Sequence, residues 1–146
     1  MALITLRNTE FYKPLPQELP WELIAQGCAQ HELVELKELI DLDYTRIVCL
    51  QEEGTTLGIY AMRAVNDTRF ELLSLAVATE YQHHLLGRRL LGHALGLAES
   101  KAGREVELSV CANNLRVLEI VSRYGFVRLS QDAAQFVRLR FELTPE

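Results

Sequence analysis

Apolar residues follow two periodicities along the chain, which alternates between strand-like and helical stretches. Short apolar runs bounded by turn residues are typical of strands; they cover 2–7, 45–51, 56–64, 70–78, 105–111, 126–130 and 134–143. Leucines spaced three and four apart predict helices; these cover 21–28, 31–40, about 87–102 and 114–124. The order β, α, α, β, β, β, α, β, α, β, β predicts a mixed α/β fold, and no linker divides the chain. We therefore expect a single domain over 1–146.

Turn and breaker residues indicate where several elements meet. Three prolines within 13–20 mark a connection, and Gly54 predicts a hairpin turn between the two strands that flank it. The strand 70–78 is so apolar that we expect it to be buried on both faces. The helix that follows contains Gly92 and Gly96, and each glycine costs about 1 kcal/mol of helix stability relative to alanine.

Composition places the chain among ordinary folded proteins. Of its 146 residues, 49% are hydrophobic and 24% are charged, which excludes disordered, collagen-like and disulfide-knot chains. It has neither a long apolar run nor a signal-like start, so we expect no membrane span and a cytoplasmic setting. Cys28, Cys49 and Cys111 are odd in number and form no CxxC pair, so neither a disulfide framework nor a metal site is indicated.

The net charge of −5 argues against nucleic acid as a partner, because domains that bind nucleic acid carry basic surfaces. The charge is also uneven. Residues 1–60 contain ten acids and four bases, for −6, and the remainder contains ten acids and eleven bases, for +1. Two interpretations stay open: the halves could form ligand subsites of opposite polarity, or the acidic half could be a solvated helix face.

The junction between the strand 70–78 and the following helix carries the most informative chemistry. A helix N-terminus presents unpaired amides and the positive end of the helix dipole, which suits phosphate groups. Arg88 and Arg89 stand in the first turn, where the dipole favours acids instead. Their placement is explained if an anion binds beside them. The alternative is two solvated arginines.

At this junction the letters LSLAVATEYQ are followed by HHLLGRRLLGHAL. The segment resembles the acetyl-CoA-binding motif of the GNAT superfamily of N-acetyltransferases. In that family a strand ending in an apolar-Ala-Val triplet leads through Q/R-x-x-G-x-G/A into a long helix. Gln82 matches the first position of the motif and Gly87 the last, while Leu85 stands where the first glycine usually does.

A second spacing strengthens the resemblance. Asn114 lies eleven residues before the pair Gly125 and Phe126, with a helix between them and a strand after them, as in the family. The resemblance covers roughly 44–143, and the first 40 residues fit the family's variable helices on the substrate side. It implies the family's single mixed-sheet, three-layer α/β fold for acyl-CoA-dependent N-acyl transfer.

The resemblance implies how acetyl-CoA, the acyl donor, binds. The backbone of the strand would pair with the pantetheine amides like an added strand, and the loop and helix start would hold the pyrophosphate. The implied cofactor-binding residues are Leu75, Ala76, Val77, Gln82, His83, His84, Leu85, Leu86, Gly87, Arg88 and Asn114.

Two features of this loop affect the implied site. A β-carbon at Leu85 narrows the close approach that glycine allows, and a positive φ there would cost about 1 kcal/mol or more. His83 and His84 are either additional phosphate donors when protonated or exposed loop residues. Because they are adjacent, they lack the spacing of a helical metal pair, and no metal is assigned.

The resemblance also implies a catalytic base. An ammonium group must lose a proton before its nitrogen attacks a thioester. Glu71, six residues before Val77, matches the catalytic glutamate of the histone-acetyltransferase branch of the family. Strand alternation predicts that Glu71 shares a face with Val77 and the alternate residues between them. The alternative is an edge glutamate that pairs with Arg63 or Arg69. The backbone amide of Val77 would polarise the thioester carbonyl.

The residue that would protonate the leaving thiolate matches the family's pattern less well. Many family members have tyrosine seven residues after the asparagine, where this chain has Val121. Tyr124 lies about one helical turn further on and is the candidate acid, unless it packs into the core. Water could serve instead. Cys111 suggests either an acyl-cysteine route or, since the family transfers directly, a buried strand cysteine.

Three functions are therefore open. The first is acetyl-CoA-dependent N-acetylation of a primary amine, on a small molecule or a protein, and the acidic segment 21–43 suggests a cationic acceptor. The second is a non-catalytic acyl-CoA-binding regulator, which the altered glycine and the missing tyrosine permit. The third is a structural module with the same fold, dimeric through its last strand. A homodimer is compatible with each of them.

Overall fold

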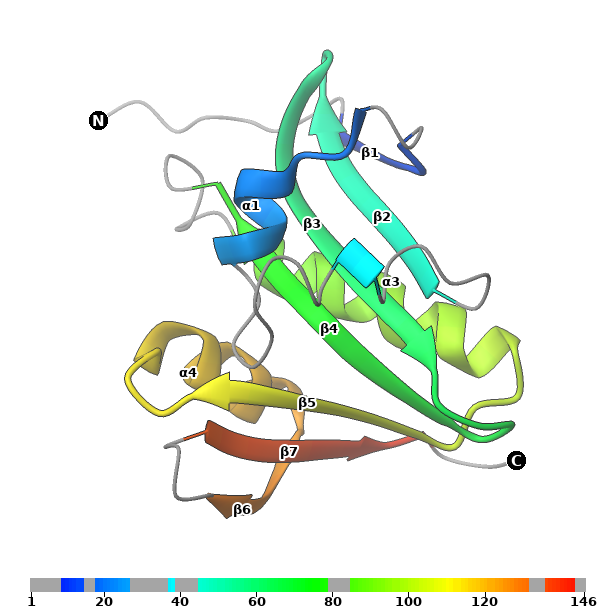
Figure 1. Cartoon of the computed structure of the whole chain (residues 1–146), viewed down its shortest axis with the longest axis vertical. Coiled ribbons are helices and arrows are strands. Elements are labelled where there is room, and N and C mark those ends of the chain that lie inside the picture. Colours follow the sequence, from blue (N-terminus) through cyan, green and yellow to red (C-terminus); the bar gives the residue numbers. More distant parts are fainter. Residues whose placement is uncertain are drawn as a thin grey trace.

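The computed structural model describes residues 9–14, 18–26, 37–38, 45–78, 85–131 and 136–143. A seven-stranded sheet with the order β1-β2-β3-β4-β5-β7-β6 runs through these residues (Figure 1). The strands are β1 (Thr9–Tyr12), β2 (Thr45–Glu52), β3 (Thr55–Ala64), β4 (Arg69–Val77), β5 (Glu105–Cys111), β6 (Val127–Gln131) and β7 (Phe136–Glu142). The helices are α1 (Trp21–Gln26), α3 (Leu86–Ser100) and α4 (Leu115–Tyr124). Among the described strands only β4 and β5 pair in parallel, so the expected mixed α/β fold is confirmed.

Most elements lie where the sequence pattern predicts them. The hairpin is confirmed: β2 and β3 are joined by Glu53 and Gly54, whose φ angles of 48° and 84° are those of a two-residue turn with both residues left-handed. β1 was not predicted, because four mixed residues carry little periodicity and its position depends on pairing with β2. The strand expected at 2–7 and most of the helix expected at 31–40 lie outside the described residues.

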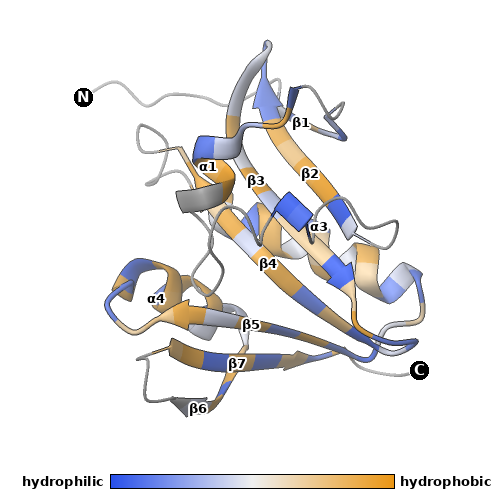
Figure 2. Ribbon diagram, in the orientation of Figure 1, coloured by the Kyte–Doolittle hydropathy of each residue, from blue (hydrophilic) through white to orange (hydrophobic). Residues whose placement is uncertain are grey.

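Helices cover both faces of the sheet (Figure 1). The larger core cluster joins β2–β5 and β7 to α3 and α4 on one face, and the smaller joins β2–β4 to Ile24 of α1 on the other. Hydrophobic colour runs along β2, β3 and β4 in Figure 2. The expected two-sided burial of β4 is confirmed, since Leu72–Ala76 are all buried. In the described part of the chain, no helix is long and apolar enough to span a membrane.

A β-bulge interrupts β4 in the middle. Ala61 of β3 pairs with Ser74, but the next residue, Met62, pairs with Leu72, so Leu73 is an extra residue on β4. A bulge resets the alternation of side chains between the two faces and bends the strand. The parallel pairing of β4 with β5 covers only Arg69–Leu72 and Glu105–Leu108. Beyond the bulge the two strands diverge, as Figure 1 shows.

The bulge also decides which face each side chain of β4 occupies. Leu75 and Val77 pack in the core under α3 and α4, whereas Leu73 and Ala76 pack on the α1 side. Glu71 lies between two residues of the α3 face, so it projects to the α1 face. The prediction that Glu71 shares a face with Val77 was therefore wrong, because it assumed an uninterrupted strand.

Candidate active site

A cavity of about 530 Å³ opens where β4 diverges from β5. It is formed by the end of β4, the start of α3 and one side of α4. The residues that line it are Leu75, Ala76, Val77, Leu85, Gly87, Arg88, Asn114, Arg116, Val117, Glu119, Ile120 and Arg123. Seven of the residues implied by the sequence resemblance are among them, from three separate segments. The fold thus brings these predicted residues together.

The backbone of β4 presents polar groups toward the open side of the strand. The amide of Ala78 donates to the carbonyl of Leu57 at 2.8 Å, while Gly58 and Val77 are register partners. In an antiparallel ladder this makes Gly58 and Val77 a non-hydrogen-bonded pair, so the N–H and C=O of Val77 point away from β3. Alternation gives Leu75 the same direction and turns the backbone of Ala76 toward β3. An extended ligand carrying amides can therefore add to this edge at Leu75, and the backbone of Val77 points in the same direction.

The start of α3 supplies a second set of amides. The first α3 bond runs from the amide of Arg89 to the carbonyl of Leu85 at 3.3 Å, so the amides of Leu86, Gly87 and Arg88 have no partner within the helix. Leu85 precedes the helix with φ 59° and ψ 20°, the left-handed conformation considered in the sequence analysis. The side chain of Leu86 is buried in the core, so only its backbone can face a ligand.

α4 adds a cap and two arginines. The side-chain oxygen of Asn114 accepts a hydrogen bond from the amide of Val117 at 3.3 Å and so caps the helix. Arg116 and Arg123 were missed by the sequence analysis, although their spacing of seven residues places them on one face of the helix. Arg123 pairs with Glu119 at 2.9 Å.

The charged side chains that line the cavity are mostly cationic. They are Arg88, Arg116 and Arg123 against Glu119, so three positive charges and one negative leave a net charge of +2. Together with the α3 amides that have no partner within the helix, this charge favours an anionic ligand such as a diphosphate. Gln82, His83 and His84 lie outside the described residues.

Tyr124 does not reach this cavity. Its ring packs edge-on against Phe141, with centroids 5.9 Å apart. Its hydroxyl lies beside α3, 3.2 Å from the position that a β-carbon on Gly92 would take. Val121, at the position where many family members have tyrosine, is fully buried. Cys111 is half-buried at the end of β5 and is not among the lining residues.

Glu71 also lies outside the cavity, on the opposite face of the sheet. Its Oε1 accepts a hydrogen bond from Nε of Arg63 at 2.9 Å and forms an ion pair with Nη2 at 2.8 Å, one of the two pairings considered from sequence. The side chain of Glu71 is 14% exposed. Within the described residues, its Oε2 accepts no side-chain hydrogen bond. The carboxylate is thus held by one oxygen while the other stays available.

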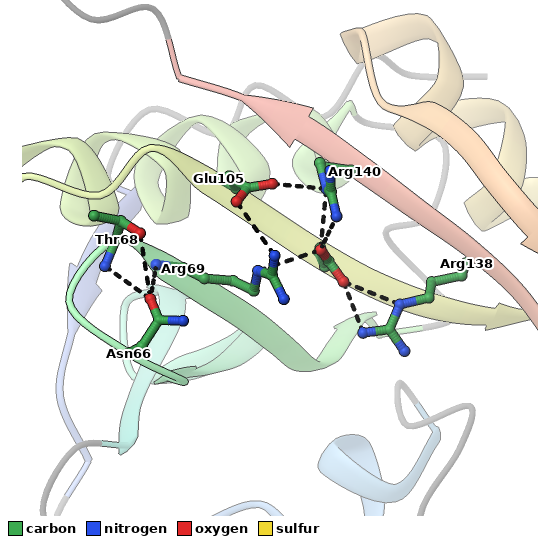
Figure 3. A network of polar contacts seen from close by, with 7 residues as sticks. Asn66, Thr68, Arg69, Glu105, Arg138 and Arg140 are labelled. Atoms are coloured by element: carbon green, nitrogen blue, oxygen red, sulfur yellow. Dashed lines mark hydrogen bonds and ion pairs between the residues drawn. The ribbon is translucent and has the colours of Figure 1, made fainter.

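A network of charged residues lies on the same face as Glu71, and Figure 3 shows Arg69, Glu105, Arg138 and Arg140, which belong to it. Glu107 of β5 is the register partner of Glu71, and Arg138 and Arg140 of β7 donate to its carboxylate. Burial opposes the charged form of Glu107, but the hydrogen bonds and charges of the two arginines outweigh it and lower the pKa of that carboxyl. Glu107 is therefore a buried anion at neutral pH. The described segments contain no group of His, Cys, Asp and Glu side chains placed to hold a metal ion.

Comparisons with known proteins agree with this geometry. A GNAT family acetyltransferase from Elizabethkingia anophelis, solved with acetyl-CoA bound, superposes with a TM-score of 0.78 at 18% identity, covering 94% of this chain and 99% of that one. The ribosomal-protein-S18-alanine N-acetyltransferase from Escherichia coli gives 0.77 at 17% identity, covering 94% and 96%. An acetyltransferase from Bacillus subtilis in complex with CoA gives 0.74 at 16% identity, covering 94% and 99%.

At these identities the structural similarity shows the fold alone. A search of curated proteins by sequence gives no significant match. The model of the acetyltransferase (GNAT) family, however, matches residues 1–126, which is most of the chain. The chain belongs to the GNAT family of acetyltransferases.

Proposed function

We propose that this protein transfers an acetyl group from acetyl-CoA directly to a primary amine and that residues 1–146 form one catalytic domain. One observation carries the proposal: the outward-facing backbone of β4 and the α3 amides that have no partner within the helix meet at one cavity of net positive charge. Acetyl-CoA has the matching parts, since its pantetheine arm carries amides and its diphosphate is anionic. Two structural neighbours were solved with acetyl-CoA or CoA bound, which supports the same donor here.

Each part of the cavity then has a role in binding the donor. Leu75 and Val77 pair through their backbones with the pantetheine amides, and Ala76 lies between them in the lining of the cavity. The first amides of α3 and the side chain of Arg88 hold the diphosphate. Arg116 and Arg123, on one face of α4, add positive charge near the same ligand.

Glu71 is the proposed general base. The amine approaches from the α1 face, where β4 and β5 part, and gives its proton to the carboxylate directly or through water. Arg63 fixes the orientation of Glu71 by binding Oε1, and Oε2 stays free for the proton. The amine nitrogen forms a bond to the thioester carbon, the carbon–sulfur bond breaks, and the electron pair leaves on sulfur.

The other two catalytic groups come from backbone and solvent. The amide of Val77 faces the open side of β4 and is the proposed donor to the thioester carbonyl oxygen. Tyr124 packs between α3 and Phe141, so its position does not support a role as the acid. We assign protonation of the leaving thiolate to water.

The test combines donor binding with turnover. Acetyl-CoA binding is measured by calorimetry, and transfer is then measured over a panel of primary amines. Glu71→Gln is expected to lower kcat at neutral pH by about 10²–10⁴-fold, with unchanged affinity for acetyl-CoA. Glu10→Gln, which removes a carboxylate from β1, is the matched control and should retain wild-type activity.

Three results would contradict the proposal in different ways. Absence of acetyl-CoA binding at millimolar ligand would reject the donor site. Wild-type rates for Glu71→Gln would remove Glu71 as the base while leaving the transferase intact. Tight acetyl-CoA binding without transfer to any amine would favour a ligand-binding regulator, which is consistent with the positions of Leu85 and Tyr124.

A further inference from the structure

The buried carboxylate of Glu107 organises two arginines on the face that Glu71 shares. Glu107 is only 2% exposed. Its Oε1 accepts from Nε and Nη2 of Arg138 at 3.0 and 2.7 Å, and its Oε2 accepts from the same two atoms of Arg140 at 3.0 and 2.7 Å. Four short, charge-assisted bonds to one buried group fix both guanidinium planes relative to the sheet.

Both arginines keep donors that Glu107 does not use. A guanidinium carries five N–H donors, and Glu107 engages only the edge formed by Nε and Nη2. Among the hydrogen bonds of the described residues, none uses Nη1 of Arg138 or of Arg140. Arg138 is 45% exposed, so a solute can reach its side chain. The network is thus a rigid support with an open guanidinium edge.

Positive charge is least compensated at Arg138. At the other end of the network, Glu105 contacts Arg140 at 2.8 Å and Arg69 at 3.5 Å. The charge of Glu142 also acts on Arg140. Arg138 meets no acid in the described chain except Glu107, which it shares with Arg140. An anion that approaches this face is therefore attracted most strongly to Arg138.

Arg138 also lies on the side of the network nearer the divergence of β4 from β5. Its register partner is Ser109, the first residue of β5 beyond the pairing with β4. Glu71 is the register partner of Glu107 on the adjacent strand. Neighbouring strands are about 4.8 Å apart, and Arg138 is level with Ser109, two residues or about 6.7 Å beyond Glu107, so Glu71 and Arg138 are about 12 Å apart at the backbone. Their side chains lie on one face, and a small molecule can contact both.

We propose that Arg138 binds a carboxylate of the acceptor, so that the acceptors are small amino acids whose amine and carboxylate are a few bonds apart. This inference rests on the proposed transferase function and names the substrate class for it. Glu107 is a positioning residue that holds Arg138 in place. The expectation of a cationic acceptor came from the acidic segment 21–43, of which the structure describes only 21–26 and 37–38. The arginines beside Glu71 indicate the opposite charge.

Matched acceptor pairs test the inference in the wild-type protein. Free amino acids, such as glycine and β-alanine, are compared with their carboxamides, and a diamine is included. All rates are referred to the concentration of unprotonated amine, because amidation lowers the pKa of the amine. We expect kcat/KM to be about 10- to 100-fold higher for the acid than for its amide, the range of a charge-assisted hydrogen bond.

Variants of Arg138 separate its effect from general damage. Arg138→Gln should raise KM for the amino acids to about the KM for the amides. The rates with the amides and the affinity for acetyl-CoA should stay unchanged. Arg138→Lys keeps the positive charge but loses the paired donors of the guanidinium, so its KM for the amino acids should lie between that of the wild type and that of Arg138→Gln. Arg128→Gln, on the exposed strand β6, is the matched control and should change none of these values. If Arg138→Gln fails to fold, the acid–amide comparison in the wild type still decides.

The outcomes distinguish this inference from the proposed function. Equal use of acids and amides by the wild type, or preference for the diamine, would overturn the inference and leave the transferase standing. An equal loss of both acceptors in Arg138→Gln would reduce Arg138 to a structural residue. A protein that binds no acetyl-CoA, or transfers to no amine, would reject the proposed function, and the inference would fall with it.

Discussion

Leu85 holds a backbone conformation that leucine rarely adopts. Its φ of 59° lies in the left-handed region, where contact between Cβ and the backbone costs an ordinary residue about 1 kcal/mol. The side chain is 67% exposed, so it gains little from burial in return. The cost falls at the start of α3, where the chain must turn so that the first helix amides face the cavity. Local strain at such a turn is common where a ligand binds.

Leu85→Gly should therefore stabilise the fold. Glycine adopts the left-handed conformation freely, and this gain exceeds the added entropy of the unfolded chain, so we expect an increase of up to about 1 kcal/mol in the free energy of unfolding. Urea denaturation measures the change. Acetyl-CoA affinity should be at least as high as in the wild type, because glycine allows a closer approach of ligand to backbone.

Leu115→Gly is the matched control for this substitution. Leu115 is also a strongly exposed leucine, at 73%, but it stands in the first turn of α4 with a helical backbone. The same change there should destabilise the protein by about 0.5–1 kcal/mol. Equal destabilisation by both substitutions would show that the conformation of Leu85 carries no strain.

The face of the sheet on which Glu71 lies could not be determined from the sequence. Glu71 was expected to share a face with Val77, but the residues from Leu72 to Ala76 are nearly all apolar and the strand is buried on both faces. An apolar run of this kind has no alternation that would reveal an extra residue. The bulge at Leu73 was therefore invisible in the sequence, and with it the true face of Glu71.

Helix α3 contains two glycines, Gly92 and Gly96, whose substitution by alanine can be compared directly. A β-carbon on Gly96 would meet nothing within 4 Å, whereas one on Gly92 would lie 3.2 Å from the hydroxyl of Tyr124. No neighbour among the described residues therefore requires a glycine at position 96. Gly92 instead allows the close approach of α4, through its last residue.

Gly96→Ala should stabilise the helix by about 1 kcal/mol, the difference in helix propensity, and raise Tm by about 4 °C. Gly92→Ala has the same propensity gain, but Tyr124 must move, so its Tm should rise less or fall. Thermal unfolding followed by circular dichroism compares the two. A larger gain at Gly92 than at Gly96 would contradict the packing described for Tyr124.

At the scale of elements, pattern alone located nearly all of the described strands and helices. The bounds predicted for β5 are those observed, and the stop of α4 at Gly125 is confirmed. Contacts between distant segments were harder to foresee. Glu107 alternates with apolar neighbours and looks like a solvated strand residue, yet two arginines more than thirty residues away bury it. The sequence did contain a signal for this pairing, because acids alternate along β5 and arginines alternate along β7, the strand opposite.

The whole molecule separates two sites by its central sheet. The cavity proposed for acetyl-CoA lies on the side of α3 and α4, and Glu71 with its arginine network lies on the side of α1. The pairing of β4 with β5 ends at Leu72, beside the bulge in β4, and the cavity is lined by β4 residues beyond that point, from Leu75 to Val77. The bulge in β4 thus determines where the donor on one face and the acceptor on the other would meet.

Two ionisable groups on opposite sides of this sheet, half-buried His93 and buried Glu107, contribute to the response to acid. The ring of His93 in α3 stacks on the ring of Phe11, with their centroids 4.1 Å apart, and its Nδ1 lies 2.7 Å from the hydroxyl of Tyr60. Burial lowers the pKa of His93 below its ordinary 6.5. Arg89, whose guanidinium lies over the Phe11 ring, adds a positive charge nearby. Glu107 has a pKa lowered below its ordinary 4.5, by its bonds to Arg138 and Arg140 against the opposing effect of burial.

Both groups make the protein less stable in acid, in two separate stages. As the pH falls below about 6.5, the unfolded chain protonates His93 while the folded protein resists it, so the free energy of unfolding decreases. Below about 4.5 the unfolded chain protonates Glu107 first, and stability falls again as the pH approaches the folded pKa. Urea midpoints measured from pH 8 to pH 4 should show both decreases. His93→Gln should reduce the upper stage and preserve the lower one, since glutamine keeps a partner for Tyr60 without a titrating group. An unchanged upper stage in His93→Gln would assign that stage to the other histidines.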